Sequence, residues 1–114
     1  MQMPTIICLC GSTRFKKAFI AANFRETMEG KIVVSVGWFS HSDAEIYFPT
    51  PEEKLALDEL HLRKIDLADE VLILNVGGYI GESTAKELAY ALTIGKRIRF
   101  FEPEMSPVRE GANQ

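Results

Sequence analysis

A glycine-rich stretch over residues 75–87 combines side chains that could bind an anion with one that could act as an acid, base or nucleophile. It contains three glycines and two small hydroxyl side chains, and it ends at the carboxylate of Glu87. The apolar run 70–74 before it is typical of a buried strand, and residues 87–92 have apolar side chains at helical spacing. A turn between such a strand and helix presents backbone N–H groups and the positive helix end to a ligand at the sheet edge. Its candidate binding residues are Asn75, Gly78, Tyr79, Gly81, Ser83 and Thr84.

The same stretch also allows a purely structural role for Glu87. Thr84 and Glu87 have the S/T-x-x-E spacing of a capping box. In that role Thr84 would be the helix N-cap, and Glu87 would accept a hydrogen bond from the Thr84 amide. From the spacing alone, the structural and the catalytic roles have equal weight.

A second strand–turn–helix unit lies at the start of the chain. Residues 5–10 form an apolar run, and a helix is expected over residues 14–29. Gly11 and Ser12 in the turn could cradle a phosphate, and Arg14 could add a charge-assisted hydrogen bond. The alternative is that Ser12 or Thr13 only caps the helix and that Arg14, Lys16 and Lys17 point into solvent. The turn has neither a G-x-G-x-x-G fingerprint nor a Walker loop.

Asp58 and His61 are a candidate acid–base pair. They stand at positions i and i+3 of a helix that is expected over residues 52–67, so their side chains can touch. A carboxylate beside an imidazole raises the pKa of the imidazole and can orient the ring for proton transfer. The alternative is an ordinary charged pair on the helix surface.

Aromatic side chains gather in residues 37–51, a stretch without clear periodicity. It follows an expected strand over residues 31–36, so it should lie at the same sheet edge as the two turns. Trp38 and its aromatic neighbours could stack on a nucleobase or close the site. The alternative is that these rings pack into the core.

The order of these elements predicts the fold class. Apolar runs over residues 5–10, 31–36, 70–74 and 96–101 alternate with three helical stretches. A β-α-β-α-β-α-β order predicts an α/β protein with a parallel four-stranded sheet and helices on both faces. We expect a small flavodoxin-like (Rossmann-like) three-layer fold with strand order 2-1-3-4. The whole chain, 1–114, should be a single domain, with residues 102–114 as a loose C-terminal tail.

Composition and charge exclude several classes of protein. A net charge of −3 argues against a nucleic-acid binder, because no large basic face is evident. No apolar run reaches the ~20 residues of a membrane span, and no signal-peptide pattern is present. Cys8 and Cys10 share one face of a strand and cannot bridge each other, which fits a reducing cytoplasm. Two cysteines and two distant histidines lack zinc-ligand spacing, so no metal or other cofactor is expected.

Two helices have apolar side chains on opposite sides. Over residues 14–29 and 52–67, two apolar stripes lie across the helix from each other. One sheet face can cover only one stripe of each helix, so we expect a homo-oligomer, at least a dimer.

Four short stretches make the chain resemble the nucleoside 2-deoxyribosyltransferase superfamily, whose relatives include nucleoside-monophosphate N-glycosidases. They are residues 10–14, 68–71, 81–91 and 95–98, which together span most of residues 6–101. In that family the glutamate that matches Glu87 attacks the anomeric carbon and holds the sugar covalently. The resemblance also implies that Ser12, Arg14 and Ser83 grip the 5′-phosphate in the monophosphate branch.

The resemblance implies an enzyme that cleaves the N-glycosidic bond of a nucleoside or nucleoside 5′-monophosphate, without a metal. Water would make it a hydrolase, and a second base as acceptor would make it a transferase. The chain departs from the family where a carboxylate protonates the leaving base: that position is His61, with Asp58 one turn earlier. Ser83 and Ala85 also replace family glycines. His61 could take the acid role, Asp58 could supply it, or the protein could be an inactive nucleotide-binding module.

Overall fold

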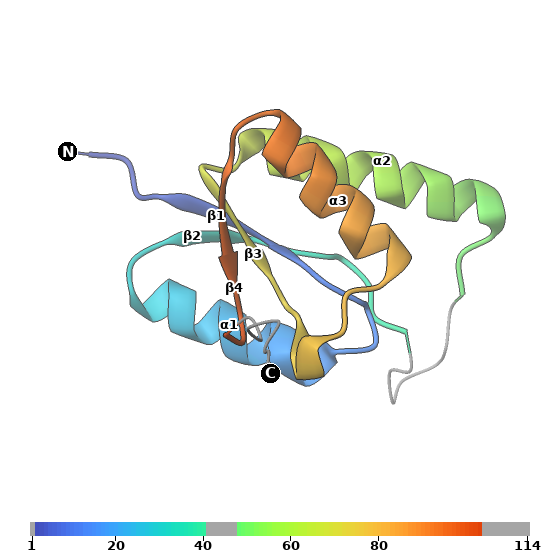
Figure 1. Cartoon of the computed structure of the whole chain (residues 1–114), viewed down its shortest axis with the longest axis horizontal. Helices are drawn as coiled ribbons and strands as arrows, with labels where there is room; N and C mark the ends of the chain where they lie inside the picture. The colour runs from blue at the N-terminus through green and yellow to red at the C-terminus, as the bar shows by residue number, and fades with distance from the viewer. Residues whose placement is uncertain (1, 41–47, 104–114) are drawn as a thin grey trace, which may run out of the picture.

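The strands form one parallel sheet. The computed structural model describes residues 2–40 and 48–103, and within them four strands pair in the order β2-β1-β3-β4. Every pair is parallel (Figure 1), and the strands are β1 (Ile6–Cys10), β2 (Ile32–Val34), β3 (Glu70–Ile73) and β4 (Arg97–Phe100). The expected α/β fold with a parallel sheet of order 2-1-3-4 is confirmed.

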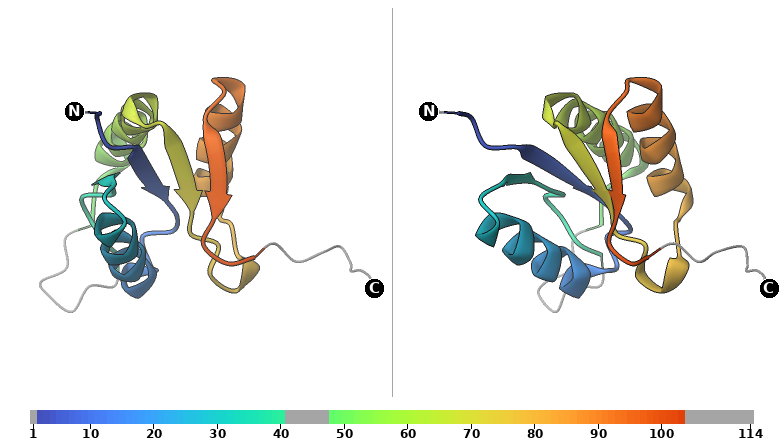
Figure 2. Two further views of the ribbon diagram at one scale, coloured as in Figure 1. Left: turned by 90° about the vertical axis from the view of Figure 1, so that its left-hand side faces the viewer. Right: turned by 60° about the vertical axis from the view of Figure 1, so that its left-hand side comes forward.

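Helices cover both faces of this sheet. One face packs against α1 (Lys16–Met28), and the other packs against α2 (Pro51–Leu67) and α3 (Glu82–Thr93). Figure 2 shows the sheet between these two groups of helices. The arrangement is consistent with a small flavodoxin-like three-layer fold.

The central strand β1 contributes to both layers of the core. Ile7 and Leu9 pack with residues of α1, whereas Cys8 and Cys10 pack with residues of α2 and α3, and all four are fully buried. Successive side chains of a strand point to opposite faces, so a strand that is covered on both faces is apolar at every position. This places both cysteine side chains under α2 and α3, and both are free thiols.

The edge strand β2 is shorter than its apolar run. It pairs with β1 only as far as Val34, although the run continues to Val36. The Ser35 carbonyl accepts a hydrogen bond of 2.7 Å from Lys64 of α2, and Val36 packs against the core on the α1 side of the sheet. The chain therefore leaves the sheet early at this edge.

The start of α2 is fixed by a capping box. The Thr50 hydroxyl accepts a hydrogen bond from the Glu53 amide at 3.1 Å, and the Glu53 carboxylate accepts one from the Thr50 amide at 2.8 Å. Pro51 occupies the first helical position, where its missing N–H costs nothing. The helix begins one residue before the expected residue 52.

The start of α3 differs from the capping box expected at Thr84. The helix begins at Glu82 with Gly81 as its N-cap, so Thr84 and Glu87 both lie inside it. The Ala85 amide already donates to the Gly81 carbonyl at 2.9 Å, which is the first helical hydrogen bond. The capping role of Thr84 and Glu87 is therefore wrong, because their three-residue spacing falls within a helix that has already begun.

A buried carboxylate ties α1 to β4, the far edge strand. Glu26 of α1 is fully buried and accepts two hydrogen bonds, of 3.0 and 3.1 Å, from the guanidinium of Arg99. Lys31 adds a third at 2.7 Å. The hydrogen bonds from Arg99, followed by those from Lys31, outweigh burial and lower the pKa of Glu26 to about 2.

The last described residues are attached to the turn after β3. Glu102 donates its amide to Asn75 at 2.9 Å and accepts a hydrogen bond from the Gly77 amide at 3.0 Å. The expected loose tail thus has its first residue held in place, and residues 104–114 lie outside the described part of the chain. Within residues 2–40 and 48–103, no helix has the length and apolar character needed to cross a membrane.

Candidate functional site

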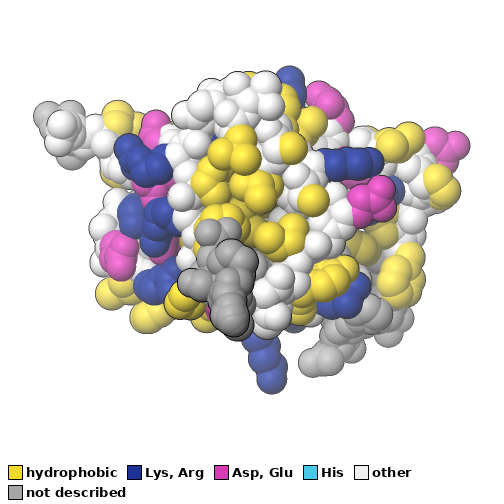
Figure 3. Space-filling view, in the orientation of Figure 1, with side chains coloured by type: hydrophobic (Ala, Val, Ile, Leu, Met, Phe, Trp, Pro, Cys, Tyr) yellow, Lys and Arg dark blue, Asp and Glu magenta, His cyan; other side chains and the backbone are white. Residues whose placement is uncertain are grey.

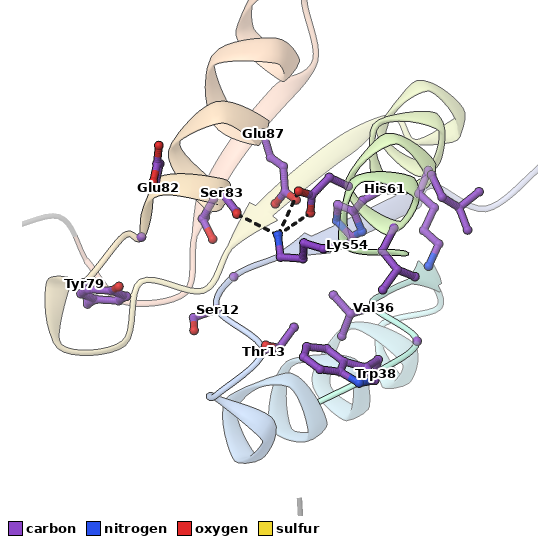
Figure 4. Close-up of a pocket in the computed structure, with 18 residues that line it drawn as sticks. Ser12, Thr13, Val36, Trp38, Lys54, His61, Tyr79, Glu82, Ser83 and Glu87 are labelled. Atoms are coloured by element: carbon purple, nitrogen blue, oxygen red, sulfur yellow. Dashed lines mark hydrogen bonds and ion pairs between the residues drawn. The ribbon is translucent and has the colours of Figure 1, made fainter. Parts of the chain in front are cut away.

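A pocket of about 250 Å³ opens at the carboxyl ends of β1 and β3, where the turns before α1 and α3 meet. One face of α2 and the segment after β2 complete its walls (Figure 4). Most of the expected site residues line it: Gly11, Ser12, Trp38, Asp58, His61, Tyr79, Gly81, Ser83, Thr84 and Glu87. Open parallel sheets bind ligands at this edge.

Glu87 reaches into the pocket from the second turn of α3. Its side chain extends from α3 toward the side chains that α2 contributes (Figure 4). Burial raises the pKa of the Glu87 carboxyl, the charge of His61 opposes this shift, and the charge of Asp58 adds to it. Glu87 is therefore a half-buried carboxyl at the pocket wall.

Asp58 is paired with a lysine. Lys54, one turn earlier on α2, donates to both carboxylate oxygens of Asp58 at 2.8 and 2.9 Å and lies 3.3 Å from the Ser83 hydroxyl. These contacts link α2 to the start of α3 across the pocket, as the dashed lines in Figure 4 mark. Among the described residues, Asp58 makes its hydrogen bonds with Lys54 and none with His61. The expected contact between Asp58 and His61 is not formed.

His61 is buried and faces two thiols. Its Nε2 atom lies 3.6 Å from the Cys8 sulfur and 3.4 Å from the Cys10 sulfur. Burial alone would lower the pKa of His61, but the hydrogen bond with Cys8 and the charges of Cys8 and Glu87 outweigh it and raise the pKa. The imidazole thus lies between the core cysteines and the pocket that it lines.

Cys8, Cys10 and His61 form a group that could hold a metal ion. Their ligand atoms all lie within 4.8 Å of one another, and all three residues are buried. The expectation of no metal relied on the separation of cysteines and histidines along the sequence. In the folded protein this separation no longer matters, because α2 packs over the face of β1 that carries both sulfurs and so brings the three residues together.

The turn after β1 contributes Gly11, Ser12 and Thr13 to the pocket. The Ser12 hydroxyl lies opposite the start of α3 and accepts a hydrogen bond from the Arg14 amide at 3.3 Å. Gly11 approaches Leu74 closely, so that an added Cβ would lie 2.9 Å from the Leu74 Cβ. A glycine at this position therefore allows the turns after β1 and β3 to come together.

Arg14 does not line the pocket. Its guanidinium lies over the ring of Tyr79, 5.0 Å from the ring centroid. Tyr79 itself lines the pocket and packs edge-on against Phe15, with the ring centroids 5.9 Å apart. Ser12 and Ser83 thus meet at one pocket as expected, whereas Arg14 contacts the pocket wall.

Asn75 and Gly78 shape the turn that carries Tyr79 and are not among the lining residues. Asn75 is buried, and its amide donates to the Glu102 carbonyl at 3.1 Å while its oxygen accepts from the Glu102 amide. Gly78 has a φ of 82°, in the left-handed region that favours glycine. Their roles in the described structure are conformational.

The aromatic segment after β2 divides between the pocket and the core. Trp38 lines the pocket on the side away from α3 (Figure 4), whereas Phe39 packs against Phe19 with ring centroids 5.4 Å apart. Phe39 thus packs into the core, as one alternative expected, while stacking of Trp38 on a base stays a prediction. Phe48 is exposed, and Tyr47 lies outside the described residues.

Sequence reasoning did not identify Lys54 and Lys64, which also line the pocket. They precede and follow Asp58 and His61 at helical spacing, so all four side chains lie along one face of α2. Extending that period along the helix would have found both lysines. The helical spacing gives no indication of the two cysteines beside His61, because they belong to β1 and not to α2.

A scan against protein-family models gives no match for this chain, and a search of the curated proteins also finds none.

Proposed function

We propose that the protein cleaves the N-glycosidic bond of a nucleoside or a nucleoside 5′-monophosphate, with Glu87 as the nucleophile. The observation that carries the proposal is the position of Glu87, whose carboxyl lines the same pocket as His61 at the carboxyl edge of the sheet. The resemblance of residues 81–91 to the catalytic segment of nucleoside deoxyribosyltransferases supports the same role.

The chemistry needs two groups with different tasks. Breaking the bond leaves positive charge on the sugar and negative charge on the departing base, so a carboxylate must act near the anomeric carbon and a proton donor near the base. In the first step a Glu87 oxygen bonds to the anomeric carbon, the bond to the base nitrogen breaks, and that nitrogen takes a proton from His61. In the second step water attacks the anomeric carbon, Glu87 leaves, and the proton of water returns to His61. This division of labour parallels that of retaining glycosidases.

The remaining lining residues support binding of such a substrate. Trp38 offers an aromatic surface for a base. Ser12 and Ser83 lie in the turn before α1 and the first turn of α3, where backbone amides and helix dipoles favour a phosphate. Lys54 adds a cation within 3.3 Å of the Ser83 hydroxyl. We therefore assign the phosphate to the Ser12–Ser83 side of the pocket.

The direct test is to incubate the purified protein with a panel of ribo- and deoxyribonucleosides and their 5′-monophosphates. Free base, separated by chromatography, is the expected product. Adding a second base separates the two outcomes of the last step, because a transferase will form a new nucleoside and a hydrolase will form free sugar. No base release from any substrate would contradict the proposal.

A second candidate is a binding module that holds a nucleotide without cleaving it. It is favoured by one observation: Asp58, the acid one helical turn before the position of the family's proton donor, is paired with Lys54. Calorimetry separates the two candidates. Tight binding of a monophosphate without release of base would identify a sensor or sequestering protein.

The proposed enzyme is a cytoplasmic homo-oligomer. The free thiols of Cys8 and Cys10 fit a reducing compartment. Ile20, Phe24 and Met28 leave one side of α1 apolar and exposed, which supports self-association.

A further inference from the structure

Beside the pocket lies a cluster of three possible metal ligands, of which the proposed reaction uses only His61. Cys8 and Cys10 point from β1 toward α2, and His61 points back from α2, with Nε2 3.6 and 3.4 Å from the two sulfurs. All three side chains are buried. Hydrogen bonds between a core histidine and two thiols would be the ordinary explanation.

We propose that Cys8, Cys10 and His61 bind a zinc-type divalent ion. The distances carry this inference. Tetrahedral zinc with Zn–S bonds of about 2.3 Å and Zn–N bonds of about 2.0–2.1 Å separates a sulfur from a nitrogen ligand by about 3.6 Å. The two observed separations, 3.6 and 3.4 Å, are close to this value.

The chemistry of the donors selects the type of ion. Two thiolates and an imidazole suit zinc, whereas magnesium and calcium prefer oxygen ligands. Three protein ligands leave the fourth position of a tetrahedral ion for water or another side chain. Glu87 lines the pocket together with His61, so its carboxylate is the candidate for that position.

A thiolate is the form that binds metal, so binding of the ion would release the protons of both thiols, and the affinity for the ion should rise with pH.

The ion and the proposed reaction would both involve His61. The ion would bind Nε2, the atom that faces the two sulfurs, so a proton for the leaving base would have to come from the other ring nitrogen. The inference itself does not depend on the proposed function, because binding of the ion is measured without substrate. Absence of a metal site would leave the glycosidase proposal standing, and absence of base release would leave the metal site standing.

The test is to titrate the reduced, chelator-treated full chain with Co²⁺, a spectroscopic substitute for zinc. We expect a sulfur-to-cobalt charge-transfer band and intense visible bands of tetrahedral cobalt, both saturating at one equivalent and disappearing when Zn²⁺ is added. If the folded wild-type protein gives neither band, the proposal is overturned and the cluster is a hydrogen-bonded core.

Variants locate the ion. Cys8→Ala, Cys10→Ala and His61→Gln should each weaken Co²⁺ binding by at least about a hundredfold, since each removes a direct ligand and loss of even a supporting group costs about 10- to 100-fold. Asp58→Asn is the matched control, because it removes a nearby pocket carboxylate outside the ligand set and should leave the spectrum unchanged. A spectrum lost in Asp58→Asn but retained in both cysteine variants would also overturn the proposal. Circular dichroism checks the fold of each variant, and the wild-type titration decides the question if a variant does not fold.

Discussion

Lys54 is the side chain that connects the two halves of the pocket. It donates hydrogen bonds to Asp58 of α2 and lies within hydrogen-bond distance of Ser83 at the start of α3. A phosphate placed between Ser12 and Ser83 would gain a charge-assisted hydrogen bond from this ammonium group. Binding of a nucleoside 5′-monophosphate should therefore depend on Lys54 more strongly than binding of a nucleoside.

We predict that Lys54→Ala will weaken binding of a nucleoside 5′-monophosphate by roughly 1.5–3 kcal/mol, the typical size of a hydrogen bond to a charged group. Binding of the matching nucleoside should change far less. Isothermal calorimetry measures both affinities. Lys86→Ala is the control, because Lys86 is exposed and pairs only with Glu82 in the described structure. Equal losses for the two ligands would contradict the assignment of the phosphate.

The residues that could be predicted from the sequence are those placed by turns. Ser12, Ser83 and Glu87 meet because β1 and β3 are neighbours and both turns leave the same edge of the sheet. The partners of His61 could not be predicted in this way. They come from a strand that is more than fifty residues away, and only the packing of α2 on β1 brings them together.

At the scale of elements, the helix starts show what a local pattern can and cannot decide. A capping box forms at Thr50, where Pro51 and two acidic residues in the first turn agree with it. The same spacing at Thr84 has no such support, because Gly81 and Glu82 start the helix earlier. A three-residue spacing therefore identifies a cap only when the flanking residues also mark a helix start.

We predict that Thr50→Ala will lower the free energy of unfolding by about 1 kcal/mol, because it removes the N-cap of α2. Urea denaturation followed by circular dichroism measures the change. Thr93→Ala is the control: Thr93 is exposed near the end of α3, where its hydroxyl donates to the Ala89 carbonyl and caps no N-terminus. A loss in Thr93→Ala as large as that in Thr50→Ala would argue against the cap.

The Glu26 network makes the attachment of α1 to β4 dependent on pH. The pKa of Glu26 is about 2 in the folded protein, below its ordinary value of 4.5. The folded state therefore binds fewer protons than the unfolded state between these values. Its contribution to stability is complete above pH 4.5 and is lost as the pH falls toward 2.

We predict that Glu26→Gln will lower the stability at neutral pH and will flatten its decline between pH 4.5 and pH 2. The full contribution of the ionised group corresponds to roughly 3 kcal/mol. Denaturant titrations across this pH range measure it. Glu29→Gln is the control, because Glu29 also pairs with Lys31 but is half-exposed, and it should leave the pH dependence almost unchanged. Parallel pH curves for wild type and Glu26→Gln would contradict the account.

At the scale of the whole molecule, apolar side chains remain on the surface. On α1, Phe19 and Ala22 are buried while Ile20, Phe24 and Met28 are exposed, as the two stripes predicted. On α2, Leu55 lies on the same side of the helix as the buried Ile65 but is 70% exposed, because it lies in the first turns of the helix, well before Ile65. Figure 3 shows a second apolar area where α3 and β4 lie. The surface thus offers more than one face for self-association.

We predict a dimer or larger assembly by light scattering at micromolar concentration. Phe24→Asp should dissociate it, because a charge on the apolar stripe of α1 would be buried in the interface. Leu92→Asp, at an exposed apolar position of α3, is the comparison. A monomer mass for the wild-type protein would refute self-association. If only Leu92→Asp dissociates the assembly, the interface lies on α3 and not on α1.

The fold and the location of the pocket could be predicted, because the sequence shows the spacing of apolar residues and the order of strands and helices. The charge pairs in the site could not be predicted in this way. Asp58 has two possible partners one helical turn away, Lys54 and His61. Only the rotation of α2 on the sheet decides between them, by placing His61 against the core and Lys54 toward Ser83. That rotation is set by packing with residues distant in the sequence.

The measurement that tests the central claim most directly is base release by Glu87→Gln beside Glu82→Gln. Both glutamates line the pocket from α3, but only Glu87 is half-buried and interacts with the charge of His61, whereas the Glu82 side chain is 87% exposed. We expect Glu87→Gln to stay folded and to lose base release by several orders of magnitude, because a neutral amide cannot form the covalent ester. Glu82→Gln should retain most of the activity. Undiminished base release by a folded Glu87→Gln protein would contradict the role of Glu87 as the nucleophile.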